Sequence, residues 1–93
     1  MDDEAINQAI AAKLGMSLPY TYSIKAAWEI VEHLRLKKMM VRVSCIENMW
    51  VCEIIALSDF VTLYPRQGKA KEALFKSAPL AISTAFLDMK CNA

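Results

Sequence analysis

The feature that most constrains the fold of this chain is a change in the spacing of its apolar residues at Met39. From Ile24 to about Lys38, apolar side chains recur every three or four residues, which is the period of an amphipathic helix. The predicted apolar stripe of this helix is Ile24, Ala27, Val31 and Leu34, flanked by Trp28 and Ile30. From Met39 to Leu57 apolar side chains alternate at every second residue, which is the period of a β-strand. The chain is therefore predicted to combine a helix with a strand segment that follows it directly.

Three helices are predicted, at residues 1–15, 23–38 and 77–91. Ser23 and Ser77 can each cap the helix that follows them, because a serine side chain accepts a hydrogen bond from the first turn. The first helix begins instead with acidic residues, whose charge suits the positive end of the helix dipole. It can close at Gly15.

The alternating segment, residues 39–57, is predicted to form a β-hairpin around the two-residue loop Glu47-Asn48. This register places Cys45 opposite Trp50 and Arg42 opposite Glu53, so the only opposite charges face each other. One face of the hairpin then carries Val41, Val43, Cys45, Trp50, Cys52 and Ile54. The other face carries Met40, Arg42, Ser44, Val51, Glu53 and Ile55. A longer loop stays open, because Glu-Asn is not the best two-residue turn.

Residues 58–76 are predicted to form a connection that can include a third strand, Phe60–Tyr64, ended by Pro65. Ala73–Phe75 fits either another short strand or a helical turn. The 93 residues form one domain. The predicted fold class is α+β, with a small antiparallel sheet of about three strands packed with helices. The element order is α-α-β-β-β-α, and the arrangement is αβα sandwich-like.

The cysteines at positions 45 and 52 could form a metal site, a disulfide, a redox pair or a purely structural pair. On the predicted hairpin, Cys45 and Cys52 are diagonal neighbours on one face, roughly 7–8 Å apart. That is too far for an unstrained disulfide. A metal site needs further ligands, and Cys91 lies near the chain end with no CxxC spacing anywhere. The sequence favours free thiols that are buried as small hydrophobic side chains, and no metal or other cofactor.

Catalytic residues are not indicated by any motif. His33 falls on the polar side of its helix together with Glu29 and Glu32, where a solvated histidine and solvated carboxylates are the simplest interpretation. No nucleophile elbow, P-loop or glycine-rich phosphate-binding motif occurs, and the chain has only two glycines. The protein is therefore predicted not to be an enzyme.

Charge and hydropathy argue against several classes of partner. The net charge is +1, which leaves no strong electrostatic attraction to nucleic acid or to an anionic membrane. The uncharged run at residues 77–87 is too short to cross a bilayer, and no uncharged run in the chain is longer. The acidic start differs from a signal peptide, so a cytoplasmic location is expected.

Two basic clusters keep a nucleic-acid interface open as an alternative. The first contains Arg35, Lys37, Lys38 and Arg42, and the second contains Arg66, Lys69, Lys71 and Lys76. Within the first cluster, Arg35, Lys38 and Arg42 are the candidate phosphate contacts.

The last predicted helix carries no charge from Ser77 to Leu87 and is apolar on several sides. Such a helix has to be covered on several sides. It can pack on the sheet and on the first helix at once, or part of it can form an interface. The second interpretation predicts a homodimer, because a second copy is the commonest partner of such a surface. Its candidate interface residues are Met40, Val51, Ile55, Phe86, Leu87 and Met89.

The segments AAWEIVEHL and SAPLAISTAFL, separated by a two-stranded segment with a tryptophan, resemble the phage ABA sandwich domain family. The matching residues of the first block are Tyr22, Ser23, Ala26, Ala27, Trp28, Glu29, Val31, Glu32 and Leu34. Those of the second block are Ala78, Pro79, Leu80, Ala81 and Ile82. The resemblance covers about residues 19–90. The connection after Ser58 looks longer than is usual in that family.

The resemblance implies a small bacteriophage or prophage protein, with no catalytic or binding residues to carry over. Together with the missing catalytic motifs, it predicts a non-enzymatic accessory protein that binds a host or phage protein in the bacterial cytoplasm. An inhibitor of host defence, of the anti-CRISPR kind, is one such role. The alternative is a small nucleic-acid-binding module that uses the two basic clusters.

Overall fold

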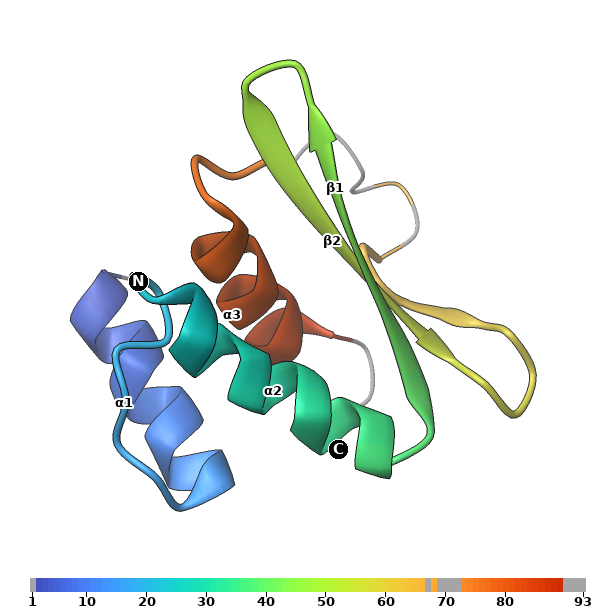
Figure 1. Cartoon of the computed structure of the whole chain (residues 1–93). Helices are drawn as coiled ribbons and strands as arrows, with labels where there is room; N and C mark the ends of the chain where they lie inside the picture. Colours follow the sequence, from blue (N-terminus) through green and yellow to red (C-terminus); the bar gives the residue numbers. More distant parts are fainter. Residues whose placement is uncertain (1, 67, 69–72, 90–93) are drawn as a thin grey trace.

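The computed structural model describes residues 2–66, 68 and 73–89. In this part of the chain, three helices lie on one side of a three-stranded antiparallel sheet (Figure 1). The elements are α1 (Asp3–Leu14), α2 (Ile24–Leu36), β1 (Met39–Ile46), β2 (Met49–Ala56), β3 (Thr62–Tyr64) and α3 (Ala78–Asp88). The α+β fold class and the order α-α-β-β-β-α are confirmed. Because the described helices share one side of the sheet, no described helix covers its other face.

The helix starts are set by side-chain caps. The Ser23 hydroxyl accepts a hydrogen bond from the Ala26 N–H at 3.2 Å, and the Ser77 hydroxyl accepts one from the Leu80 N–H at 3.3 Å. Asp2 caps α1 in the same way, by accepting from the Ala5 N–H at 2.8 Å. Both predicted serine caps are confirmed.

The helix ends depart slightly from the predicted ranges. Gly15 closes α1 in the left-handed conformation, with φ 75°, as predicted. Helix α2 ends at Leu36, two residues before the predicted end, because Lys38 turns left-handed with φ 62° to start β1. Helix α3 ends at Asp88, and residues 90–91 of its predicted range lie outside the described residues.

The hairpin has the predicted register throughout. Cys45 lies opposite Trp50, Val43 opposite Cys52 and Arg42 opposite Glu53. The Arg42 guanidinium donates two hydrogen bonds to the Glu53 carboxylate, at 2.8 and 3.1 Å, which pins this register from the outer face. The loop is the predicted Glu47-Asn48, with Glu47 in the left-handed region at φ 56°.

The centre of the sheet is β2, which has neighbours on both edges. Strand β3 pairs with it antiparallel, through Tyr64 opposite Ile54, and is shorter than the predicted Phe60–Tyr64. Near the hairpin loop, Phe75 exchanges two backbone hydrogen bonds with Trp50, at 2.7 and 2.8 Å. The segment before α3 is therefore strand-like at Phe75, which decides between the two alternatives for Ala73–Phe75.

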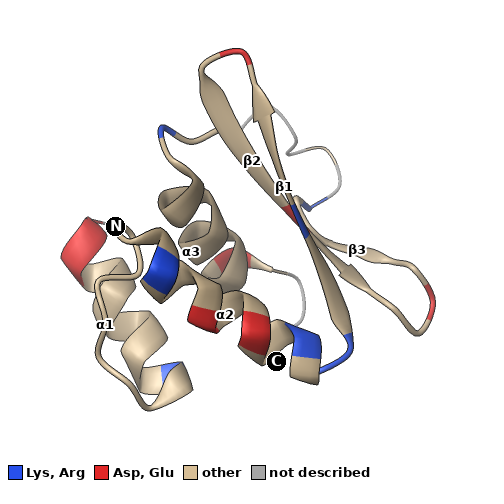
Figure 2. Ribbon diagram, viewed as in Figure 1, with Lys and Arg blue, Asp and Glu red and all other residues tan. Residues whose placement is uncertain are grey.

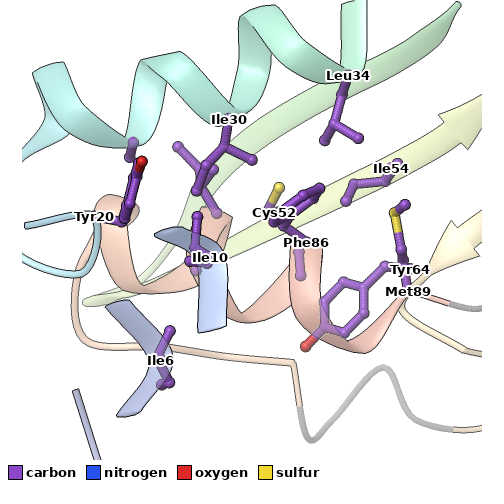
Figure 3. Packing of buried hydrophobic residues seen from close by; sticks show 14 of the residues in the cluster. Ile6, Ile10, Tyr20, Ile30, Leu34, Cys52, Ile54, Tyr64, Phe86 and Met89 are labelled. Atoms are coloured by element: carbon purple, nitrogen blue, oxygen red, sulfur yellow. The ribbon is translucent and has the colours of Figure 1, made fainter. Parts of the chain in front are cut away.

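Helix α3 is the centre of the core. It packs against the sheet through β2 and also contacts α1 and α2. Figure 3 shows Ile30 and Leu34 of α2 pointing toward Cys52 and Ile54 of β2 and toward Phe86 of α3, all in one cluster. The prediction that this apolar helix packs on both the sheet and the first helix is confirmed.

The buried face of α2 differs from the predicted stripe. Its buried residues are Ala26, Ala27, Ile30 and Leu34. Ile24 and Trp28, which were predicted on or beside the apolar stripe, are each 53% exposed. The helix is rotated so that the small side chains Ala26 and Ala27 face the interior, which lets the backbones of neighbouring elements approach closely. Trp28 is thereby turned outward.

The predicted dimer interface is wrong, because three of its six residues are buried inside the protein. Phe86 and Met89 are fully buried, because α1 and α2 cover the sides of α3 that the prediction left bare. Ile55 is also buried, since it lies on the central strand between Met40 of β1 and Thr62 of β3. Of the six residues, Leu87 and Val51 are half-buried and only Met40 is exposed.

Candidate functional site

The two hairpin cysteines are free thiols. The prediction that both are buried is right for Cys52 and wrong for Cys45, which is exposed near the hairpin loop. The pKa of the Cys52 thiol is raised to about 12. Burial is the main cause, and the negative charge of the neighbouring Glu53 raises the pKa further. No group of three metal-binding side chains occurs within residues 2–66, 68 and 73–89. Cys91 lies outside the described residues. Cys52 packs in the core as a small apolar side chain, as the sequence predicts.

Thiol labelling tests this assignment. With a thiol-specific alkylating reagent near pH 8, Cys45 should react rapidly, because it is exposed. Cys52 should react at least about a hundredfold more slowly, because it is buried and its raised pKa leaves little thiolate. Mass mapping of labelled peptides with and without denaturant measures both rates. Rapid native labelling of Cys52 would show that the core opens at β2.

His33 is not the solvated residue that the sequence predicts. It is half-buried, and its ring lies edge-on to Phe86, with ring centroids 5.7 Å apart and planes at 80°. Its Nε2 atom is buried and has no hydrogen-bond partner among the described residues. Glu29, Glu32 and His33 line one hollow of about 210 Å³. The other lining residues are Leu14, Met16 and Leu36, so the described part of this hollow brings no nucleophile to the histidine.

A second hollow, of about 500 Å³, lies between α1 and α3. Its apolar lining includes Ile6, Phe75 and Leu87, and Asp3 and Asp88 add two carboxylates. Leu87, one of the predicted interface residues, is therefore part of a concave surface. Nothing else among its lining residues points to a reaction.

Exposed apolar side chains gather at the turn between β2 and β3. Phe60 is 73% exposed, and its neighbours Leu57 and Val61 are also exposed. Phe60 has φ 59°, a left-handed conformation that costs an L-residue roughly 1–2 kcal/mol. A bulky aromatic residue in this region is a true outlier. The Phe60 side chain is therefore exposed to solvent while its backbone adopts an unfavourable conformation.

The turn is fixed by three hydrogen bonds. The Ala56 N–H donates to the Val61 carbonyl at 2.9 Å, and the Val61 N–H donates to the Asp59 carboxylate at 3.2 Å. The Leu57 N–H donates to the Lys38 carbonyl at 3.2 Å and so joins this turn to the α2–β1 junction. Phe60 is thus carried on a constrained turn.

Beside the turn lies a hollow of about 510 Å³. It is lined by Lys37, Lys38, Met39, Ala56, Leu57 and Ser58. Both lysines are exposed. We call Lys37, Lys38, Leu57, Phe60 and Val61 the tip surface. Lys37, Lys38 and Leu57 line the hollow, and the exposed Phe60 and Val61 belong to the same turn as Leu57, at the end of the sheet near the start of β1 (Figure 1).

The predicted basic clusters are only partly assembled. Arg35 pairs with Glu32 at 2.9 Å, and Arg42 pairs with Glu53 at 2.8 Å, so two of the three candidate phosphate contacts have acidic partners. Lys38 has no ion pair within the described residues. In the second cluster, the Arg66 side chain donates to the Asp88 carbonyl at 3.0 Å, and Lys69 and Lys71 lie outside the described residues. Figure 2 shows basic and acidic residues interspersed along the ribbon.

The sequence prediction missed Phe60 as a surface residue and placed it in a strand. The one available signal was Asp59, whose side chain can bond a backbone N–H two residues on and so favours a turn.

Comparison with known proteins identifies no relative. No protein-family model matches the chain, and no match was found among curated proteins or among solved structures. The resemblance to the phage ABA sandwich domain family therefore stays an expectation. Within the described residues, no helix is long and apolar enough to span a membrane.

Proposed function

We propose that this protein acts by binding another protein through the tip surface, and that it is not an enzyme. The observation that carries the proposal is Phe60, which is 73% exposed and held in a left-handed conformation. Unfavourable backbone conformations cluster at functional sites, where the constraint presents a side chain to a ligand. Exposed aromatic residues within an apolar patch are frequent centres of protein–protein interfaces.

The tip surface also indicates the chemistry of the partner. Phe60, Leu57 and Val61 supply the apolar centre, and Lys37 and Lys38 supply positive charge at its edge. This arrangement fits a partner with an apolar pocket for the phenyl ring and acidic residues around it, since apolar centres with charged rims are common in such interfaces.

The phage resemblance extends the proposal. On that basis the partner is a host or phage protein met in the bacterial cytoplasm, and a component of a host defence system is one class of partner. The resemblance supports this extension, whereas the tip surface supports only the binding of a protein.

The proposal is tested by affinity purification with matched variants. Phe60→Ser removes the aromatic centre of the tip surface. Tyr22→Ser removes an aromatic side chain that is 69% exposed at the opposite end of α2 and serves as the control. A protein that co-purifies with the wild type should be retained by the Tyr22 variant and fall at least tenfold with the Phe60 variant, because central interface residues contribute about 2 kcal/mol or more. Equal recovery with both variants would contradict the proposal.

Nucleic-acid binding is the second candidate, because Lys37 and Lys38 line a hollow beside the turn that carries Phe60, an exposed aromatic ring on which a base can stack. The pairing of Arg35 and Arg42 with glutamates weakens this candidate. It predicts affinity for a single-stranded oligonucleotide that falls steeply with salt and is lost in the double variant Lys37→Glu, Lys38→Glu. A mobility-shift titration at low salt that shows no complex would rule it out.

A further inference from the structure

The free edge of β1 is a second surface that needs a partner. Strand β1 is the edge of the sheet, with eight residues, Met39–Ile46, paired without interruption to β2 on its other side. Natural edge strands are commonly protected by proline, lysine, a bulge or short length. β1 has none of these, and its only charge, Arg42, is already paired with Glu53.

The register shows which backbone groups of β1 point outward. Trp50 exchanges its backbone hydrogen bonds with Phe75 on the far side of β2, so Trp50 and Cys45 are a pair that is not hydrogen-bonded to each other. Because hydrogen-bonded and non-bonded pairs alternate, the N–H and C=O groups of Val41, Val43 and Cys45 project from the free edge. Within residues 2–66, 68 and 73–89, no group bonds to them.

From this edge we infer that the protein forms a two-fold symmetric homodimer in which β1 pairs antiparallel with β1 of a second copy. An antiparallel pair related by a two-fold axis satisfies the outward groups of both copies at once. The two sheets then join into one continuous sheet with the order β3-β2-β1-β1-β2-β3.

Strand overlap and charge together select the register of this pairing. Only outward-pointing residues can face each other as hydrogen-bonded pairs, and the axis positions with the longest overlap of β1, Met39–Ile46, lie at Arg42 and at Val43. Placing the axis midway between Val41 and Val43 would put the two Arg42 side chains directly opposite each other, which is unfavourable. Placing it at Val43 pairs Val41 with Cys45 of the second copy and puts Arg42 opposite Ser44. The exposed Met40 then faces the exposed Ile46 of the second copy.

Helix α2 provides apolar side chains that can cover the dimer interface on the helix-bearing face of the sheet. Ile24 and Trp28, each 53% exposed, lie one turn apart on the flank of α2 that faces away from α1. The opposite flank, with Glu29 and Leu36, shares a hollow with Leu14 of α1. Figure 1 shows β1 on the side of α2 away from α1. In the dimer both copies place α2 on the same face of the joined sheet, so these flanks turn toward the two-fold axis.

This dimer is independent of the proposed function. The pairing covers residues 40–46 and leaves Phe60, Lys37 and Lys38 outside it. Loss of the dimer and loss of the protein bound at the tip surface are therefore separate results, and different variants test them.

Sedimentation of the full chain from about 1 µM to about 1 mM tests the inference. The wild type should form a reversible dimer within this range. Val43→Pro should raise the dimer dissociation constant at least tenfold, because proline removes an outward N–H that the monomer does not use. A wild type that stays monomeric throughout, or a dimer unaffected by Val43→Pro, would overturn the inference.

A pair of charge variants tests the register without relying on proline. Ser44→Glu should tighten the dimer by roughly fivefold, because each glutamate then faces Arg42 of the other copy. Ser44→Arg should weaken it by a similar factor, because like charges then face each other. Equal effects of the two variants, or effects in the opposite order, would overturn the register with Val43 on the axis.

Discussion

Replacing Phe86 with alanine should cost about 3–5 kcal/mol of unfolding free energy, measured by urea denaturation at neutral pH. Phe86 is 1% exposed and lies in the central helix α3, where its ring meets the edge of His33. Truncation removes the buried ring and leaves a cavity that its neighbours can fill only partly. Because small domains have a total stability of about 5–15 kcal/mol, this variant should be close to unfolding at 37 °C.

The same substitution at Phe60 is the matched control for Phe86→Ala. Both positions lose a phenyl ring, but Phe60 is exposed, so Phe60→Ala should change the free energy of unfolding by less than about 0.5 kcal/mol. If Phe86→Ala were to cost under about 1 kcal/mol, the description of α3 as the centre of the core would be wrong.

Replacing Phe60 with glycine should stabilise the fold while removing partner binding. The left-handed conformation costs phenylalanine roughly 1–2 kcal/mol, and glycine adopts it without that cost. Glycine loses more chain entropy on folding, roughly 0.5–1 kcal/mol, so the net gain should be about 0.5–1 kcal/mol. Thermal unfolding measures this gain.

Phe60→Ala separates the effect of losing the ring from the effect of relieving the backbone conformation. Alanine also lacks the ring but keeps the left-handed cost, so it should lose binding without gaining stability. A glycine variant less stable than the wild type by more than about 1 kcal/mol would mean that the Phe60 ring is packed in the fold, and it would remove the physical basis of the tip surface.

The hairpin could be predicted closely because two independent signals agree. The alternation of apolar residues and the facing charges of Arg42 and Glu53 select the same register, and a shift by one residue would break both. The starts of α2 and α3 could be predicted for a similar reason, because Ser23 and Ser77 act on the turn directly after them. Such interactions are local in the chain.

The buried faces of the helices could not be predicted in the same way. A helix such as α3, apolar on several sides, does not reveal which side meets α1 and which meets the sheet. Phe86 and Met89 were therefore assigned to a surface that α1 and α2 cover. In α2, Trp28 was placed beside the buried stripe by its spacing, whereas the small Ala26 and Ala27 occupy the interior.

The candidate site was missed because the left-handed position of its turn carries none of the residues usual there. Left-handed turn positions usually hold glycine or asparagine, and an aromatic residue before Val61 and Thr62 is more typical of a strand. The conformation of Phe60 depends on the Asp59 side chain and on the pairing of Ala56 with Val61, which forms only in the folded sheet.

The most direct test of the tip surface is photo-crosslinking at position 60 in the cells that naturally make the protein. A photoreactive phenylalanine analogue at Phe60 keeps the aromatic ring, and the same analogue at Tyr22, exposed at the other end of α2, is the control. Binding through the tip surface predicts a discrete protein adduct from position 60 that is absent from position 22. That adduct should also disappear when unlabelled wild type is added in excess, but not when Phe60→Gly is added. No adduct at position 60, or the same adducts at both positions, would contradict the proposed function.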